Sequence, residues 1–382
     1  MNAIQKKMTD LKQNTEWLEL FGTISFCVYY GIMVVIKAFG YVSYEMFFKI
    51  AFVLALGCLG IKVCTTKYTM REFVILYLML AISAICWLRV GEKNVLFITL
   101  SLWGLKNVRF DLLMKATVGI RIVGILLMIL LSCVGLFDMQ ANEAIGTDFS
   151  SYAVYGFGYI KSNAAYYMIF VTIAIVLYIE YDRLNLKYFL VSTAVCVLAF
   201  RATYCRTGFI VFFLMWFLIA LDKVWSYKKY FGLMTFVTAG VFGISLFFML
   251  IYQITNPILF KINRMLSGRI EITNNYYRAF GTTLFPKTVN IFWDMNYTTI
   301  DNLYMYLFIS CGAVITLLFV YWATKSQWKL YREKNYREII FFTIFAIYAV
   351  LEQSPMNPVL NPFILLTANL VYKEYQIREN RV

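Results

Sequence analysis

Two arginines and two acidic residues lie at the ends of apolar segments, where their charged side chains could bind and activate a polar substrate. Arg206 and Arg269 lie beside the ends of apolar segments, and Asp301 and Glu352 lie at the ends of two later ones. A guanidinium can bond two oxygens of one anionic group through its planar fork. A carboxylate can accept a proton from a hydroxyl group within hydrogen-bond reach. These four candidate catalytic residues therefore predict a site that binds a diphosphate-like anion and orients or activates a hydroxyl group.

Further cations surround these residues in the sequence. The segment 253–301 carries five Lys or Arg residues against three acidic ones. Arg201, Arg264 and Arg278 are candidates for binding the same anionic ligand. Two other interpretations stay open: solvated cations near lipid headgroups, and arginines that reach from a helix end to the membrane surface.

The residue types also exclude several chemistries. The chain has no histidine, which excludes histidine catalysis and histidine-ligated metal. Its eight cysteines form no CxxC pair and mostly lie in apolar runs, so they indicate neither a zinc site nor a disulfide framework. No DxD-type acidic pair follows the arginines. We therefore expect no metal and no cofactor.

The composition shows which elements must position these groups. Hydrophobic residues make up 61% of the 382 residues and charged residues only 15%. A soluble domain has nearer 25% charged residues. The chain is therefore predicted to be all-α, a polytopic membrane helix bundle that forms one domain over 1–382. Its net charge of +14 is attributed to loops at the cytoplasmic face, not to nucleic-acid binding.

Apolar runs of membrane-spanning length predict about twelve helices. The long connections are 138–161 and 253–301, and the second is expected to be a large loop outside the membrane that carries part of the site. The predicted spans are 17–36, 44–63, 72–90, 93–105, 114–137, 162–181, 187–204, 206–222, 229–252, 302–323, 338–352 and 357–372. With the N-terminus inside, 22 of the 35 Lys and Arg residues fall in cytoplasmic segments. This bias predicts both termini in the cytoplasm and the four candidate residues at the outer face.

Local patterns predict how some of these residues are held. Asn256 followed by Pro257 indicates a helix start, and Gly268 indicates its stop, with Arg269 just beyond. Asp301 falls at the start of the span 302–323, where it is either a helix cap or a functional group. Glu352 precedes two prolines that predict a rigid broken-helix turn.

Several short motifs follow one another in an order that resembles the Wzy-type polysaccharide polymerases of bacteria, in the O-antigen ligase and polymerase superfamily. Each motif is short, and the match covers about residues 145–360. The motifs are Gly156-Phe157-Gly158 with Asn163, Arg206-Thr207-Gly208, Leu266-Ser267-Gly268-Arg269, and Asp301-Asn302-Leu303-Tyr304 with Gly312.

The resemblance implies a membrane glycosyltransferase fold of the GT-C-like type and a location in the bacterial plasma membrane. It implies an undecaprenyl diphosphate-linked oligosaccharide as donor, joined to a new lipid-linked repeat unit on the outer side of that membrane. Arg206 and Arg269 match family arginines that grip the diphosphate. Asn163 and Tyr304 would help bind substrate, and a flippase and a chain-length regulator would be partner proteins. The chain departs from related ligases by having no histidine, so the base is a carboxylate or no base is used. Between the carboxylates, Asp301 is slightly favoured over Glu352.

Three alternatives remain open at this level. One is an O-antigen-type ligase that transfers finished polymer to an acceptor. Another is a flippase for lipid-linked oligosaccharides, which predicts repeated halves and a central cavity, whereas the sequence shows no repeat. The third is a structural membrane protein. For an enzyme, sugar rings are expected to stack on exposed aromatic side chains, for which the candidates are Tyr276, Tyr277, Trp293 and Tyr297.

Overall fold

The computed structural model describes residues 2–40, 46–140, 144–145, 151–152, 154–159, 161–225, 228–288, 299–373, 375 and 377–378. Almost all of its regular structure is helical. The first half contains α1 (Asn2–Ala38), α2 (Met46–Thr65), α3 (Met70–Val90), α4 (Asn94–Gly104), α5 (Phe110–Cys133), α6 (Ser162–Ile179), η1 (Tyr181–Arg183) and α7 (Leu186–Thr203). The second half contains α8 (Arg206–Val224), α9 (Tyr230–Met234), α10 (Val237–Ile251), α11 (Pro257–Met265), α12 (Arg269–Phe280), α13 (Leu303–Tyr306), η2 (Leu307–Cys311), α14 (Ala313–Arg332), α15 (Tyr336–Tyr348), η3 (Ser354–Met356), η4 (Pro362–Thr367) and α16 (Ala368–Val371).

One small antiparallel ladder interrupts this helical pattern. Strands β1 (Ala144–Ile145) and β2 (Ser151–Tyr152) pair Ala144 with Tyr152 and Ile145 with Ser151. The ladder lies within the predicted connection between two spans.

Among the described residues, seven helices are long and apolar enough to cross a membrane. They are Trp17–Ala38 within α1, then α2, α3, α5, α6, α7 and α8. Many large apolar side chains on them are exposed, among them Phe47, Leu88 and Leu198. Apolar side chains on the surface of long helices are stable in lipid and not in water. The chain is therefore a multi-pass helical membrane protein, as the composition predicts.

The other five predicted spans are shorter, broken or more polar. Helix α4 has 11 residues, α15 has 13, and the predicted span 229–252 is divided into α9 and α10 at Thr235 and Phe236. The predicted span 357–372 is not one helix but the 3-10 helix η4 followed by α16. The predicted span 302–323 is interrupted at Gly312, and the second half of α14 is polar. The total of twelve stays a prediction.

Gly312 shows why one of these breaks occurs. It ends the π-helical turn η2 with φ +89°, which an L side chain rarely adopts. A Cβ atom there would also lie 2.8 Å from the carbonyl oxygen of Leu284. The chain past α12 thus packs against the break, where Ala313 N donates to Thr283 O at 2.8 Å.

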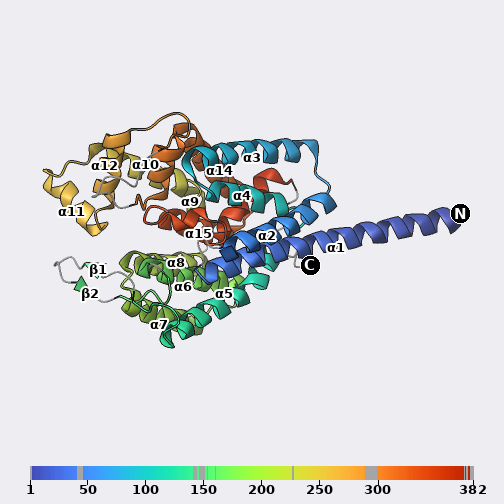
Figure 1. Cartoon of the computed structure of the whole chain (residues 1–382), viewed down its shortest axis with the longest axis horizontal. Coiled ribbons are helices and arrows are strands. Elements are labelled where there is room, and N and C mark those ends of the chain that lie inside the picture. Colours follow the sequence, from blue (N-terminus) through green and yellow to red (C-terminus); the bar gives the residue numbers. More distant parts are fainter. Residues whose placement is uncertain are drawn as a thin grey trace.

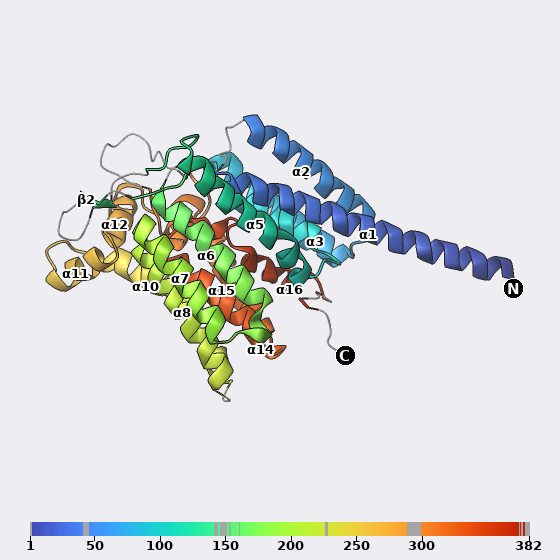
Figure 2. The ribbon, with the colours of Figure 1, turned by 90° about the horizontal axis from the view of Figure 1, so that it is seen from below.

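The helices are arranged so that α11 and α12 lie at one end and the start of α1 at the other (Figure 1). The last described residues, near the label C, lie on the same half of the molecule as α1 in both views (Figures 1 and 2). Helix α1 packs along α2 and α5, and α15 packs on α8, α10 and α14. The end that carries α11 and α12 is called the site end below.

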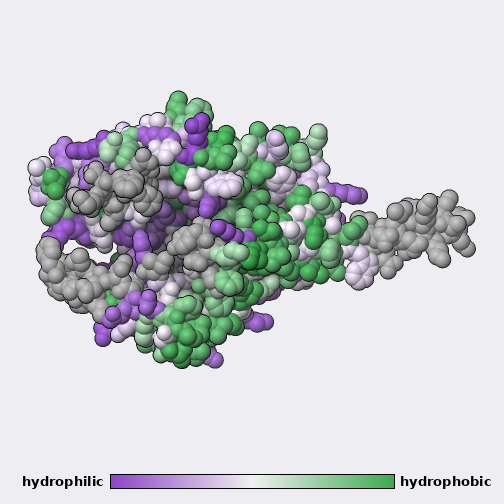
Figure 3. Space-filling view, in the orientation of Figure 1, coloured by the Kyte–Doolittle hydropathy of each residue, from purple (hydrophilic) through white to green (hydrophobic). Residues whose placement is uncertain are grey.

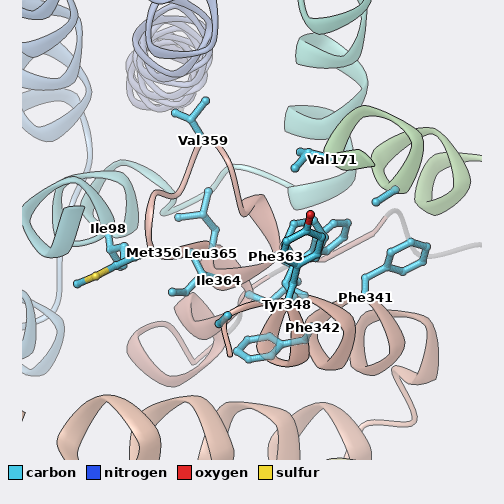
Figure 4. Close-up of a cluster of buried hydrophobic side chains, with 14 of the residues drawn as sticks. Ile98, Val171, Phe341, Phe342, Tyr348, Met356, Val359, Phe363, Ile364 and Leu365 are labelled. Carbon is cyan, nitrogen blue, oxygen red and sulfur yellow. The ribbon is translucent and has the colours of Figure 1, made fainter. Parts of the chain in front are cut away.

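Aromatic rings fill the core beside α15. Phe363 from η4 stacks on Phe341 at 5.1 Å between ring centres, and it contacts Tyr178 at 5.4 Å and Phe345 at 5.2 Å. Figure 4 shows Phe341, Tyr348 and Phe363 gathered between the helices. The non-helical segment before η4 is also enclosed by protein, since Met356 and Val359 are each 1% exposed. Enclosure is the condition under which irregular backbone is stable at membrane depth.

Candidate active site

Arg269, Asp301 and Glu352 meet at the site end of the bundle. Arg269 Nη2 lies 3.5 Å from Asp301 Oδ2 and 3.4 Å from Glu352 Oε1. The side chains of Arg269 and Glu352 are 10% and 15% exposed, whereas that of Asp301 is 32% exposed. Three of the four candidate catalytic residues, which come from three separate segments, thus form one cluster. One guanidinium group is shared by two carboxylates.

Asp301 is not the helix cap. Asn302 occupies the N-cap position of α13, and its side-chain oxygen accepts a hydrogen bond from Met305 N at 3.1 Å. The Asn302 amide also donates to Ser245 Oγ at 3.0 Å, which fixes α13 on α10. The capping interpretation therefore applies to Asn302, and the Asp301 carboxylate is directed to Arg269.

Two hydrogen bonds hold the carboxylate-bearing segments side by side. Leu303 N donates to Ala349 O at 2.8 Å, and Gln353 Nε2 donates to Ile300 O. The first bond joins α13 to the end of α15. The second joins the neighbour of Glu352 to the neighbour of Asp301. Gln353 is thus a positioning residue that the sequence analysis missed, because nothing in its spacing indicated a partner 53 positions away.

Glu352 also receives a hydrogen bond from the start of α6. Asn163 Nδ2 lies 3.2 Å from Glu352 Oε1, the oxygen that faces Arg269. This contact places the predicted residue Asn163 within the cluster. The backbone of Glu352 continues the end of α15, since its N–H donates to Tyr348 O at 3.1 Å. The starts of α6 and α12 thus both contact the carboxylate group that follows α15.

Arg269 is held by a corner between two helices. Asn256 caps α11 through Ile258 N and Leu259 N, which confirms the predicted helix start. Ser267 and Gly268 both have positive φ, +56° and +79°, and they turn the chain so that Arg269 opens α12. The predicted stop at Gly268 is therefore correct, and a second helix follows it at once.

Asn263 stabilises this corner from inside. Its side-chain oxygen accepts hydrogen bonds from Ile270 N and Glu271 N, both at 3.1 Å. Its amide group donates to Tyr252 Oη and to Glu271 Oε2. Asn263 is 2% exposed, so its four polar contacts replace water. The sequence did not predict this buried network around Asn263, because an asparagine in an amphipathic helix is usually assigned to the exposed face.

The pKa of Glu352 is raised to about 7. Burial of the carboxylate is the main cause, and the negative charge of Asp301 adds to it. The positive charges of Arg269 and Lys161 and the hydrogen bond from Asn163 oppose this shift. Burial has a larger effect than these favourable contacts, because it removes the ionised carboxylate from water. Glu352 can therefore bind or release a proton near neutral pH, which an ordinary glutamate cannot.

The Arg206 side chain lies over the aromatic ring of Tyr204. Arg206 is the first residue of α8, after a tight turn in which Tyr204 has φ +54°. The guanidinium carbon of Arg206 lies 4.8 Å from the centre of the Tyr204 ring. Within the described residues, no carboxylate forms an ion pair with Arg206. The Sγ atom of its neighbour Cys205 lies 4.0 Å from Tyr348 Oη, so the head of α8 packs on the end of α15, the helix that leads to Glu352.

Gly208 explains why this motif includes a glycine. A Cβ atom at position 208 would lie 2.3 Å from a ring carbon of Tyr166 and 2.6 Å from Tyr348 Oη. Only glycine therefore allows α8 to approach α6 and α15 this closely. The close approach places the head of α8, with Arg206, near the segment that carries Glu352.

The remaining predicted residues are more peripheral. Arg201 is exposed in the last turn of α7, and Arg278 is exposed with Nη2 3.5 Å from Tyr252 O. Arg264 is exposed on α11, 6.0 Å from the centre of the Phe260 ring. Tyr304 is 1% exposed and its hydroxyl donates to Ala346 O at 2.8 Å. The structure thus places Tyr304 in the packed interior, where it joins α13 to α15 and has no surface for a ligand.

The surface of the site end is hydrophilic. Figure 3 shows many purple residues at this end, whereas green residues cover much of the rest of the bundle. Of the aromatic residues predicted to stack on sugars, Tyr276 is 1% exposed and Tyr277 is half-buried. Trp293 and Tyr297 lie outside the described residues.

No family model, curated protein or solved structure matches this chain. Within the described residues, no group of three or more Cys, Asp or Glu side chains is arranged to hold a metal ion. The interpretation of the site therefore depends on its own geometry.

Proposed function

We propose that this chain is a glycosyltransferase of the polymerase type. It joins polyprenyl diphosphate-linked oligosaccharide repeat units into a surface polysaccharide on the outer side of a bacterial plasma membrane. The motif resemblance suggests the substrate class, and the cluster of Arg269, Asp301 and Glu352 is the observation that supports the chemistry. The membrane bundle supports a lipid-linked substrate.

The arginines suit the leaving group of this reaction. When the bond between the sugar and the diphosphate breaks, negative charge grows on the diphosphate, and preorganised cations stabilise it. Arg206 carries no ion pair within the described residues. Arg269 uses Nη2 for the carboxylates, while its buried Nε–H has no hydrogen-bond partner in the described part of the chain. A buried donor without a partner is unfavourable, and a phosphate oxygen would satisfy it.

Glu352 suits the role of base. In the proposed step, the acceptor hydroxyl oxygen bonds the anomeric carbon of the donor, the diphosphate leaves with the bonding electrons, and the hydroxyl proton passes to Glu352. A pKa near 7 gives an ionised carboxylate that is more basic than usual at neutral pH. The environment of Glu352 thus supports this role more strongly than that of Asp301, which was slightly favoured from the motif. Asp301 orients Arg269 and keeps the pKa of Glu352 high.

An apolar cavity inside the bundle suits a lipid tail. It has a volume of about 330 Å³ and lies among α3, α4, η2 and α14, with Trp322 and Ile98 in its wall. Leu307 and Met356 also line it, and these residues follow Asp301 and Glu352 closely in the chain.

The direct test is reconstitution of the full chain in lipid nanodiscs with lipid-linked repeat units isolated from cells that lack the gene. We expect a ladder of products longer than one unit, formed also in excess EDTA. Absence of a ladder with an active preparation of the same units would contradict polymerisation. In cells, deletion should leave single repeat units on lipid; loss of attached polymer while long lipid-linked chains persist would identify a ligase instead.

A further inference from the structure

One turn beside the site holds an aromatic residue in a backbone conformation that favours glycine. Phe157 has φ +48° and Gly158 has φ +80°. Tyr159 N donates to Gly156 O at 2.9 Å, which closes a four-residue turn with two left-handed central positions. Asparagine or glycine usually occupies the first of these positions, because a bulky side chain is strained there.

The surrounding structure forces this strain on Phe157. Gly156 N donates to Met139 O at 3.0 Å, and Gly158 N donates to Asp138 O at 2.9 Å. A Cβ atom at Gly158 would lie 2.6 Å from Met128 Cε, so the turn is packed closely on α5. These contacts involve backbone atoms and glycine, and none requires a phenyl ring at position 157. Packing of the fold therefore does not explain the ring, and strained residues of this kind cluster at functional sites.

The turn presents a pair of rings on the segment that leads to Asn163 and the active-site cluster. Tyr155 stacks with Phe157 at 6.1 Å between ring centres, and Tyr155 is 37% exposed. Tyr155 N donates to Ala202 O at 2.9 Å, which joins the turn to the end of α7, beside the Arg206 turn. Downstream, Asn163 bonds Glu352 directly. The rings are thus tied on both sides to segments that carry the site.

We propose that Tyr155 and Phe157 form a stacking subsite for a sugar ring of the acceptor glycan. This inference rests on the proposed function. The apolar face of a pyranose covers a flat aromatic ring, while cations and amides nearby, such as Lys161 and Asn163, suit its hydroxyl groups. Asn163, which follows this turn in the chain, contacts the same Glu352 oxygen as Arg269, so an acceptor held on the rings would reach the base through the start of α6.

The test uses variants that separate strain from stacking. Phe157→Asn relieves the left-handed strain and removes the ring, because asparagine tolerates this conformation. Phe157→Trp retains a flat ring. The matched control is Tyr77→Leu, since Tyr77 is 59% exposed and stacks on Phe73 in α3, away from the cluster. The probe is the oligosaccharide that mild acid releases from the cells' own lipid-linked repeat unit, offered as a soluble acceptor to the full-length protein.

We expect Phe157→Asn to melt at the same temperature as the wild type or higher, and to raise the KM for the soluble acceptor by about tenfold or more. Tenfold corresponds to about 1.4 kcal/mol of binding free energy. The KM for the lipid-linked donor should stay within about twofold, and Phe157→Trp should keep the acceptor KM near that of the wild type. If Phe157→Asn fails to fold, Phe157→Leu supplies the same kinetic comparison.

Two results would overturn the subsite. One is an acceptor KM in Phe157→Asn and Phe157→Leu equal to that of Tyr77→Leu. The other is an effect that follows the headgroup composition of the nanodisc, which would make Phe157 a membrane anchor. A wild-type protein that transfers nothing would contradict the proposed function instead. In that case saturation-transfer NMR with the same oligosaccharide still tests the rings, by comparing the wild type with Phe157→Leu.

Discussion

Glu352 Oε1 lies 3.4 Å from Arg269 Nη2 although the two residues are 83 positions apart in the chain. The same oxygen accepts a hydrogen bond from Asn163, and the same nitrogen faces Asp301. The base candidate and a cation candidate are therefore one electrostatic unit. A change in either residue alters the other, which makes the protonation of Glu352 and the geometry of Arg269 the properties to test.

The arginine geometry gives the first prediction. Arg269→Lys and Arg206→Lys should each lose most polymerising activity although the charge is kept. A lysine cannot form the bidentate bonds of a guanidinium, and each charge-assisted hydrogen bond contributes about 1.5–3 kcal/mol. We therefore expect rates at least about tenfold lower for each variant, measured in nanodiscs at equal protein levels. Arg89→Lys, at an exposed position at the end of α3, should keep full activity. Wild-type yields from both Lys variants would contradict the diphosphate clamp.

The carboxylates give the second prediction. Glu352→Gln should lower the rate by about 10²-fold or more, the range that general bases contribute. Asp301→Asn should also lower it, but less, because Asp301 acts through Arg269 and Glu352. Neither change removes a helix cap, since Asn302 caps α13. Size-exclusion profiles and melting temperatures check that both variants are folded. If Asp301→Asn is the more damaged of the two, Asp301 is the base; if both stay fully active, the reaction needs no protein base.

Local signals predicted the framework of this site better than its contacts. Asn256 with Pro257 and the glycine at 268 each act on the next few residues, so the sequence alone showed where α11 begins and ends. The cap of α13 was harder to assign, because Asp301 and Asn302 are adjacent and both types cap well. The structure decides for Asn302 since the Asp301 side chain has a charged partner in α12.

The contacts that assemble the site are tertiary and leave little trace in the sequence. The bond from Gln353 to Ile300 and the network of Asn263 depend on how helices pack, and neither follows a spacing rule. Hydropathy predicted the seven long helices well, because each is one uninterrupted apolar run that is long enough to cross a membrane. It predicted 302–323 and 357–372 less well. The helix is broken at Gly312 and at the prolines, but the residues around these breaks are apolar, so hydropathy does not detect the breaks.

Sidedness gives the third prediction. With both termini in the cytoplasm, a cysteine introduced at Ser267 should react with a membrane-impermeant maleimide in intact cells, whereas one at Lys325 should react only after permeabilisation. Both side chains are exposed, unlike Ser326, which is fully buried on α14. The background is a chain without its own exposed cysteines, Cys64 and Cys133. Labelling with the opposite sidedness would place the whole cluster in the cytoplasm and contradict the proposed function.

Packing at the head of α8 gives the fourth prediction. Gly208→Ala should lower the melting temperature, because its Cβ would overlap Tyr166 and Tyr348. Overpacking of this kind costs about 1–3 kcal/mol. Gly57→Ala is the matched control, since nothing lies within 4 Å of a Cβ at that helical position, and the change should be neutral or slightly stabilising. Equal melting temperatures for the two variants in the same detergent would show that α8 does not pack this closely.

The pH dependence of activity and of stability gives the last prediction. Because Glu352 must be ionised to accept a proton, kcat/KM should rise with pH through about 7 and then level off. Asp301→Asn should shift this midpoint to lower pH, since it removes a negative charge that raises the pKa. Lys161→Met should shift it to higher pH, since it removes a positive charge that lowers the pKa. A midpoint that both variants leave unchanged would show that another group titrates.

The raised pKa of Glu352 also determines how the stability of the folded protein changes with pH. The folded protein holds a proton on Glu352 up to about pH 7, whereas the unfolded chain releases it near the ordinary value of 4.5. The folded state therefore binds more protons between these values, and stability falls as pH rises from about 4.5 to 7. Glu352→Gln, which is always neutral, should lose this dependence and melt at a higher temperature than the wild type at pH 8. Melting curves at pH 5 and pH 8 measure the difference, and an equal pH dependence in the two proteins would contradict burial of the Glu352 charge.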